Sequence, residues 1–392
     1  MFNRHLPTAV PFVVLAFTAA PAFADGAFYG DPPDATHPWT VHDMNRPQPP
    51  IVTPGTFSSQ EQPGKPPSDA VVLFDGTAES LAKWEADKPS AEPTKWIVKD
   101  GNMQCVPGSG YIRTKEQFGD MQLHVEWSAP SEVKGDSQGR GNSGVFLMGI
   151  TEVQVLDNFN NPSYPDGFAG SVYGVNPPHA NPLNAPGAWQ VYDIIFRRPI
   201  YKDGKLLDAG RMTVTLNGVV VQDSTPLEGG TSHKMRHHDR PFPEQGPLKL
   251  QDHGNPVRFR NIWCRPLPKR AVDGGDMGVM DPAAATAKKL EIAATIRSDA
   301  AKLQGQAKLL RQMESLCYAP DAATGKDVEA GLTTWIATVK QIPAAGMEAK
   351  KGEIMEVYNA VKYLVEFQFL PADFSAKPEL EAIITAAGWK LK

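Results

Sequence analysis

Short strand-like runs separated by turn residues fill the middle of the chain, from residue 70 to residue 268. Asp100-Gly101 and Asn217-Gly218 each stand between two apolar runs, and both pairs are typical of the type I′ turns that close tight hairpins. Residues 121–127 alternate polar and apolar side chains, as a strand does when only one of its faces is buried. Many such runs at near-regular spacing, with almost no helical pattern, predict a mainly β fold of the sandwich or jelly-roll type.

The segments on either side differ in composition. Residues 1–24 contain an apolar run that ends in Ala22-Phe23-Ala24, which predicts a secretory signal peptide cut after Ala24 and a periplasmic or secreted protein. Residues 25–69 are rich in Pro and Gly and predict an irregular arm. After a linker at 269–282, residues 283–392 are rich in Ala, Lys, Leu and Glu, which predicts a small α-helical region for packing or oligomerisation.

Charge and cysteine content limit the classes of partner. The net charge is −5 without a basic face, so nucleic acid is not an expected partner. No later apolar run reaches the roughly 18 residues that a membrane span requires. In an oxidising compartment Cys105 and Cys264 could form a disulfide and leave Cys317 free, but three buried thiols fit the sequence equally well.

The stretch 141–158 combines turn residues with two apolar runs and carries acids. Alternation places Glu152 and Gln154 on one strand face, and Asp157 would join them only if a bulge added a residue. The spacing resembles the acid-x-acid-x-x-acid strand of laminarinase-type glycoside hydrolases. However, a retaining mechanism requires two carboxyl groups about 5 Å apart, and an amide at 154 and the shorter Asp157 argue against that pair. Polar residues on a solvated sheet face remain the structural alternative.

A second polar stretch covers residues 246–262. Gln251 and His253 share a strand face there, and histidine is the side chain best suited to proton transfer near neutral pH. Arg260 could hold a carboxylate or a sugar hydroxyl. A structural histidine at a strand end and a strand-end ion pair of the arginine are the alternatives.

Seven motifs together resemble the 3-keto-disaccharide hydrolase family over residues 70–268. They are Leu73-Phe74-Asp75-Gly76, Trp96-Ile97-Val98-Lys99-Asp100-Gly101, Leu123-His124-Val125-Glu126-Trp127, Gly141-Asn142-Ser143-Gly144-Val145-Phe146, Glu152-Val153-Gln154-Val155-Leu156-Asp157, Leu216-Asn217-Gly218 and the run from Leu250-Gln251-Asp252-His253-Gly254 through Phe259-Arg260-Asn261-Ile262. The resemblance implies a concanavalin A-like or LamG-like β-sandwich in an exported bacterial protein. Trp189-Gln190 departs from the family, where Trp-Asn is expected.

The resemblance also implies the chemistry. In a 3-keto-glycoside the ketone acidifies the C2 hydrogen, so a base can remove it while the aglycone leaves from C1, and water can then add. Glu152 and His253 are the expected catalytic pair, one as base and the other as proton donor. The residues expected to bind the 3-keto-glucoside are Glu126, Arg140, Asn142, Gln154, Asp157, Trp189, Gln251 and Arg260.

Two other functions fit the same sequence: a non-catalytic glycan-binding sandwich and a laminarinase-like β-glucan hydrolase. Aromatic side chains that could stack on sugar in any of these are Trp127, Tyr164, Tyr173 and Trp189. No cofactor is required, although a divalent cation could bind at His233 with His237, or at Glu152 with Asp157. For the histidines, a solvated charged loop is the alternative.

Overall fold

The computed structural model describes residues 27–88, 92–227, 229–235 and 241–391, so the predicted signal peptide lies outside the described residues. The chain divides into two compact units. The sandwich unit comprises residues 49–279, and the helical unit comprises residues 280–392 together with the chain up to residue 48. No helix among the described residues is long and apolar enough to cross a membrane.

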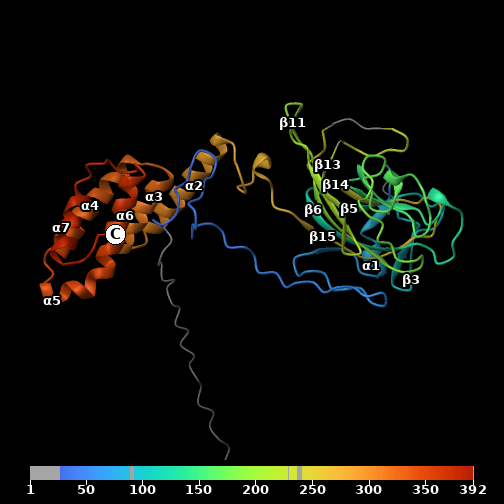
Figure 1. The fold of residues 1–392 in the computed structure, drawn as a ribbon, viewed down its shortest axis with the longest axis horizontal. Coiled ribbons are helices and arrows are strands. Elements are labelled where there is room, and N and C mark those ends of the chain that lie inside the picture. Colours follow the sequence, from blue (N-terminus) through green and yellow to red (C-terminus); the bar gives the residue numbers. More distant parts are fainter. Residues whose placement is uncertain (1–26, 89–91, 228, 236–240, 392) are drawn as a thin grey trace, which may run out of the picture. The chain divides into compact units, whose positions relative to one another are not determined.

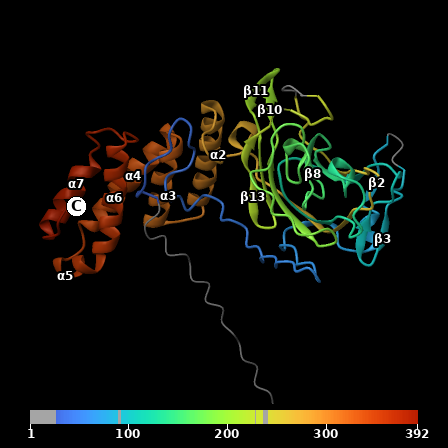
Figure 2. The same cartoon turned by 45° about the vertical axis from the view of Figure 1, so that its right-hand side comes forward.

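The sandwich unit consists of two antiparallel sheets (Figures 1 and 2), which confirms the predicted fold class. The larger sheet contains, in spatial order, β13 (Val219–Pro226), β12 (Arg211–Leu216), β9 (Gln190–Arg197), β6 (Met121–Ser128), β15 (Arg258–Pro266), β4 (Asn102–Gln104) and β3 (Ile97–Lys99), with β1 (Val71–Phe74) paired to β15. The smaller sheet contains β2 (Trp84–Ala86), β5 (Ile112–Phe118), β14 (Gly246–Leu250), β7 (Ser143–Leu147) and β8 (Thr151–Val155). A short helix, α1 (Ala78–Leu81), and a ribbon of β10 (Ile200–Lys202) with β11 (Lys205–Asp208) complete the unit.

Both predicted hairpin turns are confirmed. Asp100 and Gly101 have φ angles of 52° and 71° and connect β3 to β4. Asn217 and Gly218 have φ angles of 52° and 79° and connect β12 to β13. Positive φ at two successive residues is the geometry of a type I′ turn, which Asn or Asp followed by Gly adopts at low cost.

The core lies between the two sheets and takes alternate residues from each strand. Val125 of β6 and Val153 of β8 are both fully buried members of it. Their neighbours Glu126 and Glu152 therefore point away from the core, and they do so on opposite sides of the sandwich because the strands belong to different sheets. This separation decides which polar residues can act together.

The cysteines are free and buried. Cys105 and Cys264 contribute to the sandwich core as thiols, and Cys317 lies in the core of the helical unit. Burial raises the pKa of each thiol well above its ordinary value. Of the two alternatives that the sequence left open, the structure has the three buried thiols.

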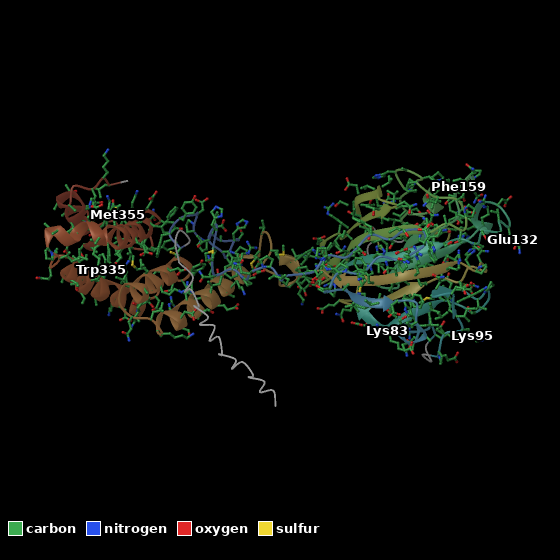
Figure 3. All side chains as sticks on the ribbon, turned by 90° about the horizontal axis from the view of Figure 1, so that it is seen from below. Lys83, Lys95, Glu132, Phe159, Trp335 and Met355 are labelled. Carbon is green, nitrogen blue, oxygen red and sulfur yellow. The ribbon has the colours of Figure 1, made fainter. Side chains whose placement is uncertain are left out.

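The helical unit packs five longer helices and one short one: α2 (Pro282–Ala300), α3 (Gly305–Tyr318), α4 (Ala322–Val339), α5 (Ala344–Met347), α6 (Lys351–Glu366) and α7 (Ala376–Ala386). Partly buried side chains, including those of Trp335 and Met355, pack against its core (Figure 3). Residues 301–304 separate α2 from α3, and α3 begins at Gly305, which has a φ angle of 58°.

The Pro-rich segment expected as one arm, residues 25–69, is shared between the units. Its first part packs on the helices: the Tyr363 hydroxyl donates to the carbonyl oxygen of Gly30 at 2.7 Å, and Asn45 donates to Glu314 at 2.6 Å. Phe28 contacts the ring of Tyr363 edge-on. Its second part, residues 49–69, belongs to the sandwich unit.

Helix α2 begins at Pro282, with Asp281 as the residue that caps it. The Asp281 carboxylate accepts hydrogen bonds from the amides of Ala283 and Ala284 at 3.0 and 3.3 Å. Asp281→Ala should therefore lower the free energy of unfolding of the helical unit by about 1 kcal/mol, whereas Asp281→Asn should keep most of it. Thermal unfolding followed by circular dichroism at a helix-sensitive wavelength measures this, and equal stability of the two variants would contradict the capping role.

Candidate active site

A row of side chains crosses the outer face of the smaller sheet. Strand register places Glu152 opposite Phe146, Phe146 opposite Lys249, Lys249 opposite Arg113, and Arg113 opposite Glu85. We call these five residues the first row. It extends from the edge strand β8 to β2 at the other edge of the sheet.

A second row runs beside the first. Gln154 lies opposite Gly144, and the amide of Gln251 donates to the Gly144 carbonyl oxygen at 3.1 Å. The Gln251 side-chain nitrogen donates to the Tyr111 hydroxyl at 2.6 Å. The Gln251 side-chain oxygen is buried and accepts no hydrogen bond from the described residues, so one polar atom in this row has unused capacity.

Glu152 is the unusual member of these rows, because its carboxyl group is buried and no cation among the described residues pairs with it. The residue is 5 % exposed, and burial raises the pKa of its carboxyl to about 8. Gly144 makes room for it: a Cβ at position 144 would lie 2.1 Å from Glu152 Oε1. At neutral pH the group is therefore mostly a protonated acid that can donate a proton.

One amide side chain bonds this carboxyl, and two further amides lie behind it. With its nitrogen turned toward Glu152, the Gln154 side chain donates to Glu152 Oε1 and to the Ser143 carbonyl oxygen, both at 3.1 Å. The Asn142 side chain donates to the carbonyl oxygen of Gln138 at 2.8 Å, and Gln138 also lies within 3.1 Å of Gln154. Uncharged donors of this kind can bind a developing oxyanion without ionising Glu152.

Residues from outside the smaller sheet bond the backbone of its edge strand at Glu152. The Tyr173 amide donates to the Glu152 carbonyl oxygen at 3.2 Å, and the Glu152 amide donates to the Thr231 hydroxyl at 2.9 Å. Further out, the Tyr173 hydroxyl bonds the Tyr164 hydroxyl at 2.9 Å and His233 Nδ1 at 3.0 Å. These residues form a wall at the end of the first row.

His253 lies in the loop that follows β14, and this loop is fixed on both sides of it. The Ser143 hydroxyl donates to the Gln251 carbonyl oxygen at 2.7 Å, and the Asn255 side chain accepts from the Asn142 amide at 2.7 Å. His253 itself is exposed, and no hydrogen bond joins its ring to the described part of the chain. The structure thus brings the backbone of His253 to the β7 end of the site and leaves its imidazole unengaged.

Asp157 does not join Glu152. The pairing of β7 with β8 continues without a bulge, and the Asp157 carboxylate instead forms a buried ion pair with Arg140 at 2.9 and 2.5 Å. Asp157 also accepts from the amide of Phe159 at 3.2 Å. Both predicted site residues, Arg140 and Asp157, therefore hold the loop after β8 in place.

Three other predicted site residues, Glu126, Trp189 and Arg260, lie on the opposite face of the sandwich. The expectation that all the predicted residues form one site is therefore wrong. Glu126 accepts hydrogen bonds from Arg260 at 2.7 Å and from Ser58 at 2.5 Å. Trp189 lies under the Arg260 guanidinium, 4.3 Å from it, and its backbone bonds the Gln60 side chain at 2.7 and 3.0 Å. Alternation within residues 121–127 placed Glu126 on the polar face of its strand, but alternation does not tell which sheet a strand joins.

His124, Glu126 and Arg260 form a second polar cluster, which binds residues 58–60 to the larger sheet. Burial disfavours ionisation of Glu126, but hydrogen bonds from His124 and Ser58 hold its pKa below the ordinary value. Burial also opposes the charge on His124, yet its bonds to Asp193 and Glu126 raise its pKa to about 9. The charges of this cluster therefore pair with one another, and the chain itself supplies the hydrogen-bond partners of the Glu126 carboxylate.

Trp127 and the expected metal ligands do not contribute to the first or second row. Trp127 is 1 % exposed and packs on Tyr192 in the core, so it cannot stack on a ligand. Among the described residues, no three of His, Cys, Asp and Glu gather as a metal site would require. His233 bonds Tyr173, and His237 lies outside the described residues.

Sequence reasoning missed most of the first row. Alternation within residues 248–251 places Lys249 and Gln251 on one face, so the polar character of that strand was visible. What was not visible is that Phe146 and Arg113 flank Lys249, because strand order depends on long-range pairing. Gly144 was recognised as a turn residue, although it is a strand residue that makes room for Glu152.

Comparisons with known proteins find relatives of this chain. The profile of the family described as "3-keto-alpha-glucoside-1,2-lyase-like domain" matches residues 69–265. A 3-keto-disaccharide hydrolase of Bacteroides thetaiotaomicron is 26 % identical over 256 residues, which cover 50 % of this chain and 78 % of that protein. A solved structure of a candidate glycosyl hydrolase from Parabacteroides distasonis is 41 % identical, with a TM-score of 0.53, and the match covers 58 % of this chain and 95 % of that one.

Glu152→Gln should stabilise the sandwich unit and flatten its pH dependence. Between the ordinary carboxyl pKa of 4.5 and the raised value of about 8, the unfolded chain ionises Glu152 and the folded chain does not, so the free energy of unfolding falls as pH rises through this window. The loss is on the order of 3 kcal/mol at pH 7. Denaturant unfolding at pH 5 and pH 8 checks it, with the exposed Glu116→Gln as control; an unchanged pH dependence would contradict the burial argument.

Glu126→Ala should destabilise the sandwich unit, because it leaves the Arg260 charge buried without its carboxylate partner and removes one of the two carboxylates that bond His124. The expected loss is about 3–5 kcal/mol. Ser58→Ala, which removes a single hydroxyl, should cost only about 1–3 kcal/mol. Thermal unfolding of both variants is compared with Glu132→Ala, which breaks an exposed ion pair with Lys134. A Glu126 variant as stable as that control would show that the cluster does not fasten the segment.

Proposed function

We propose, since the chain belongs to the family of 3-keto-α-glucoside-1,2-lyase-like domains, that it cleaves 3-keto-glycosides at the outer face of its smaller sheet. The chain is a carbohydrate-active protein of the glycoside hydrolase-like kind. Cleavage of 3-keto-glycosides in particular is supported by one observation. Glu152 is a buried acid with a pKa of about 8, and the uncharged amide of Gln154 bonds it.

The reaction requires a proton acceptor at C2 and a proton donor for the leaving oxygen at C1. The base takes the C2 hydrogen, the C2 electrons form the C1–C2 double bond, and the C1–O bond breaks as its oxygen receives a proton. Water can then add across the double bond, so that the net result is hydrolysis. This route needs only one protonated acid beside one base, unlike the paired carboxyl groups of a retaining glycosidase.

Glu152 is suited to the donor role, because it is mostly protonated at neutral pH. His253 is then the base, carried by the loop that Gln251 and Asn255 attach to β7. The Gln154 amide, which donates to Glu152 Oε1, would hold the acid in position. The unused acceptor of Gln251 suits a sugar hydroxyl.

The laminarinase-like alternative has less support. Asp157, the only other acid of that strand pattern, is committed to Arg140, and Gln154 is an amide. A second carboxylate near Glu152 is what a retaining mechanism would require. Export to the periplasm or medium remains part of the proposal and rests on the sequence of residues 1–24 alone.

The proposal is tested by turnover of a 3-keto-disaccharide and of its unoxidised counterpart. Wild-type protein should cleave only the keto substrate, and Glu152→Gln and His253→Ala should each lower kcat at least 10²-fold. The value of kcat/KM should fall above pH 8 as Glu152 loses its proton.

Glu116→Gln, an exposed change on the same sheet, is the control and should keep wild-type turnover. Near wild-type turnover by Glu152→Gln would refute the assignment of the acid. Sugar binding without product from either substrate would instead favour a glycan-binding module.

A further inference from the structure

The helical unit contains a groove that has no part in the chemistry proposed above. It has a volume of about 630 Å³ and lies between α3 and α4. Pockets that bind small molecules have volumes of about 300–1,000 Å³, so the groove is large enough for such a ligand. Its polar and aromatic lining residues recur at helical spacing on one face of each helix. They are Lys308 and Gln312 of α3 and Asp327, Thr334, Trp335 and Thr338 of α4.

Small residues keep this groove open. Gly331 on α4 faces α3 directly, because a Cβ at this position would lie 3.1 Å from Leu309 Cδ1. Leu309 is buried and forms an apolar part of the lining. Gly305 and Ala330 also line the groove and contribute little or no side chain to fill it. The open space therefore follows from the residues that α3 and α4 carry at the positions where they face each other.

Trp335 lines the groove with an aromatic ring that the protein itself does not use for polar contacts (Figure 3). It differs in this from Trp389, which also packs against the core of the helical unit. The Trp389 indole nitrogen donates to Glu348 at 2.9 Å, and its ring lies 5.5 Å from the Lys351 ammonium. The Trp335 ring is partly exposed, and no hydrogen bond, cation or second ring from the described residues engages it. Its face and its N–H are therefore available to a ligand.

Polar side chains of the groove are likewise without partners. The Gln312 amide, the Lys308 ammonium and the Asp327 carboxylate form no hydrogen bond or ion pair with the described part of the chain. The Thr334 hydroxyl donates to a carbonyl oxygen of its own helix at 3.0 Å, so its oxygen can still accept a hydrogen bond. One cation and one anion balance each other, so the groove does not select for a charged ligand.

The lining matches a neutral sugar better than another protein. A pyranose ring has an apolar C–H face and a rim of hydroxyl groups, which one aromatic face and several separate donors and acceptors complement. A docked protein would require a broad apolar surface, whereas Trp335 is the only large apolar side chain that is partly exposed among the described lining residues. We therefore infer that the groove between α3 and α4 binds a neutral oligosaccharide. The family match ends at residue 265, so this site lies outside the matched domain and does not depend on the proposed reaction.

Binding to the full chain is tested with a signal from Trp335 itself. The indole N–H resonances of nitrogen-15-labelled protein are recorded while maltotriose, cellotriose or laminaritriose is added, and Trp335→Phe identifies the Trp335 resonance by its loss. With at least one of these sugars the Trp335 resonance should shift and saturate. Ala330→Arg, which places a long side chain in the groove from an exposed helix position, should abolish the shift. Gln312→Leu should weaken the affinity about 3–10-fold, because it removes one polar contact.

Two controls are matched to these measurements. The Trp389 resonance in the same spectra should not shift, because Glu348 already engages that indole and the ring does not line the groove. Ala294→Arg makes the same substitution at an exposed alanine of α2, away from the lining residues, and should keep the Trp335 shift. Circular dichroism and the melting temperature confirm that each variant is folded.

The outcomes separate this site from other occupants and from the proposed reaction. No saturable shift with any of the three sugars, a shift that survives Ala330→Arg, or tighter binding of the anionic trigalacturonate would overturn the inference. Self-association in sedimentation experiments that Trp335→Leu abolishes would assign the groove to a second copy of the chain and overturn it as well. The Trp335 shift requires no cleavage, so a chain that shows it without cleaving a 3-keto-disaccharide would support the site and refute the reaction.

Discussion

Burial of alternate residues against one shared core is the constraint on which the rest of this structure depends. Each strand gives its apolar side chains to the space between the sheets, so its polar side chains must face outward. Two polar surfaces result. One, around Glu126, is covered by the chain's own residues 58–60, and the other, around Glu152, keeps a buried polar atom of Gln251 without a donor. Only the second surface has unused binding capacity.

The two buried acids show how surroundings decide the role of a carboxyl group. Glu126 lies among His124, Arg260 and Asn261, and these partners favour its ionised form despite burial. The Glu152 carboxyl is bonded by the uncharged amide of Gln154, so burial disfavours its charge and keeps the proton in place. The first arrangement stabilises the fold, whereas the second opposes stability above the ordinary carboxyl pKa. A group that costs stability in this way is often kept for its chemistry.

Local sequence was enough to predict several features. The turns at Asp100-Gly101 and Asn217-Gly218 follow from residues that accept positive φ, and the start of α2 follows from the capping carboxylate of Asp281. The common face of Glu152 and Gln154 follows from strand periodicity. The grouping of Glu126 with Glu152 failed because each residue was assigned a face of its strand but not a sheet.

The sequence by itself determined the fold class, the hairpins and the polar face of β8, because these depend on residues close together in the chain. Only the tertiary structure decided that Arg113 and Lys249 continue the row that begins at Glu152, since register between distant strands sets that order. It also decided that Gly144 makes room for the Glu152 carboxyl and that the cysteines remain thiols. The pKa of Glu152 belongs to this second group, because burial is a property of the packed sheet and not of the strand.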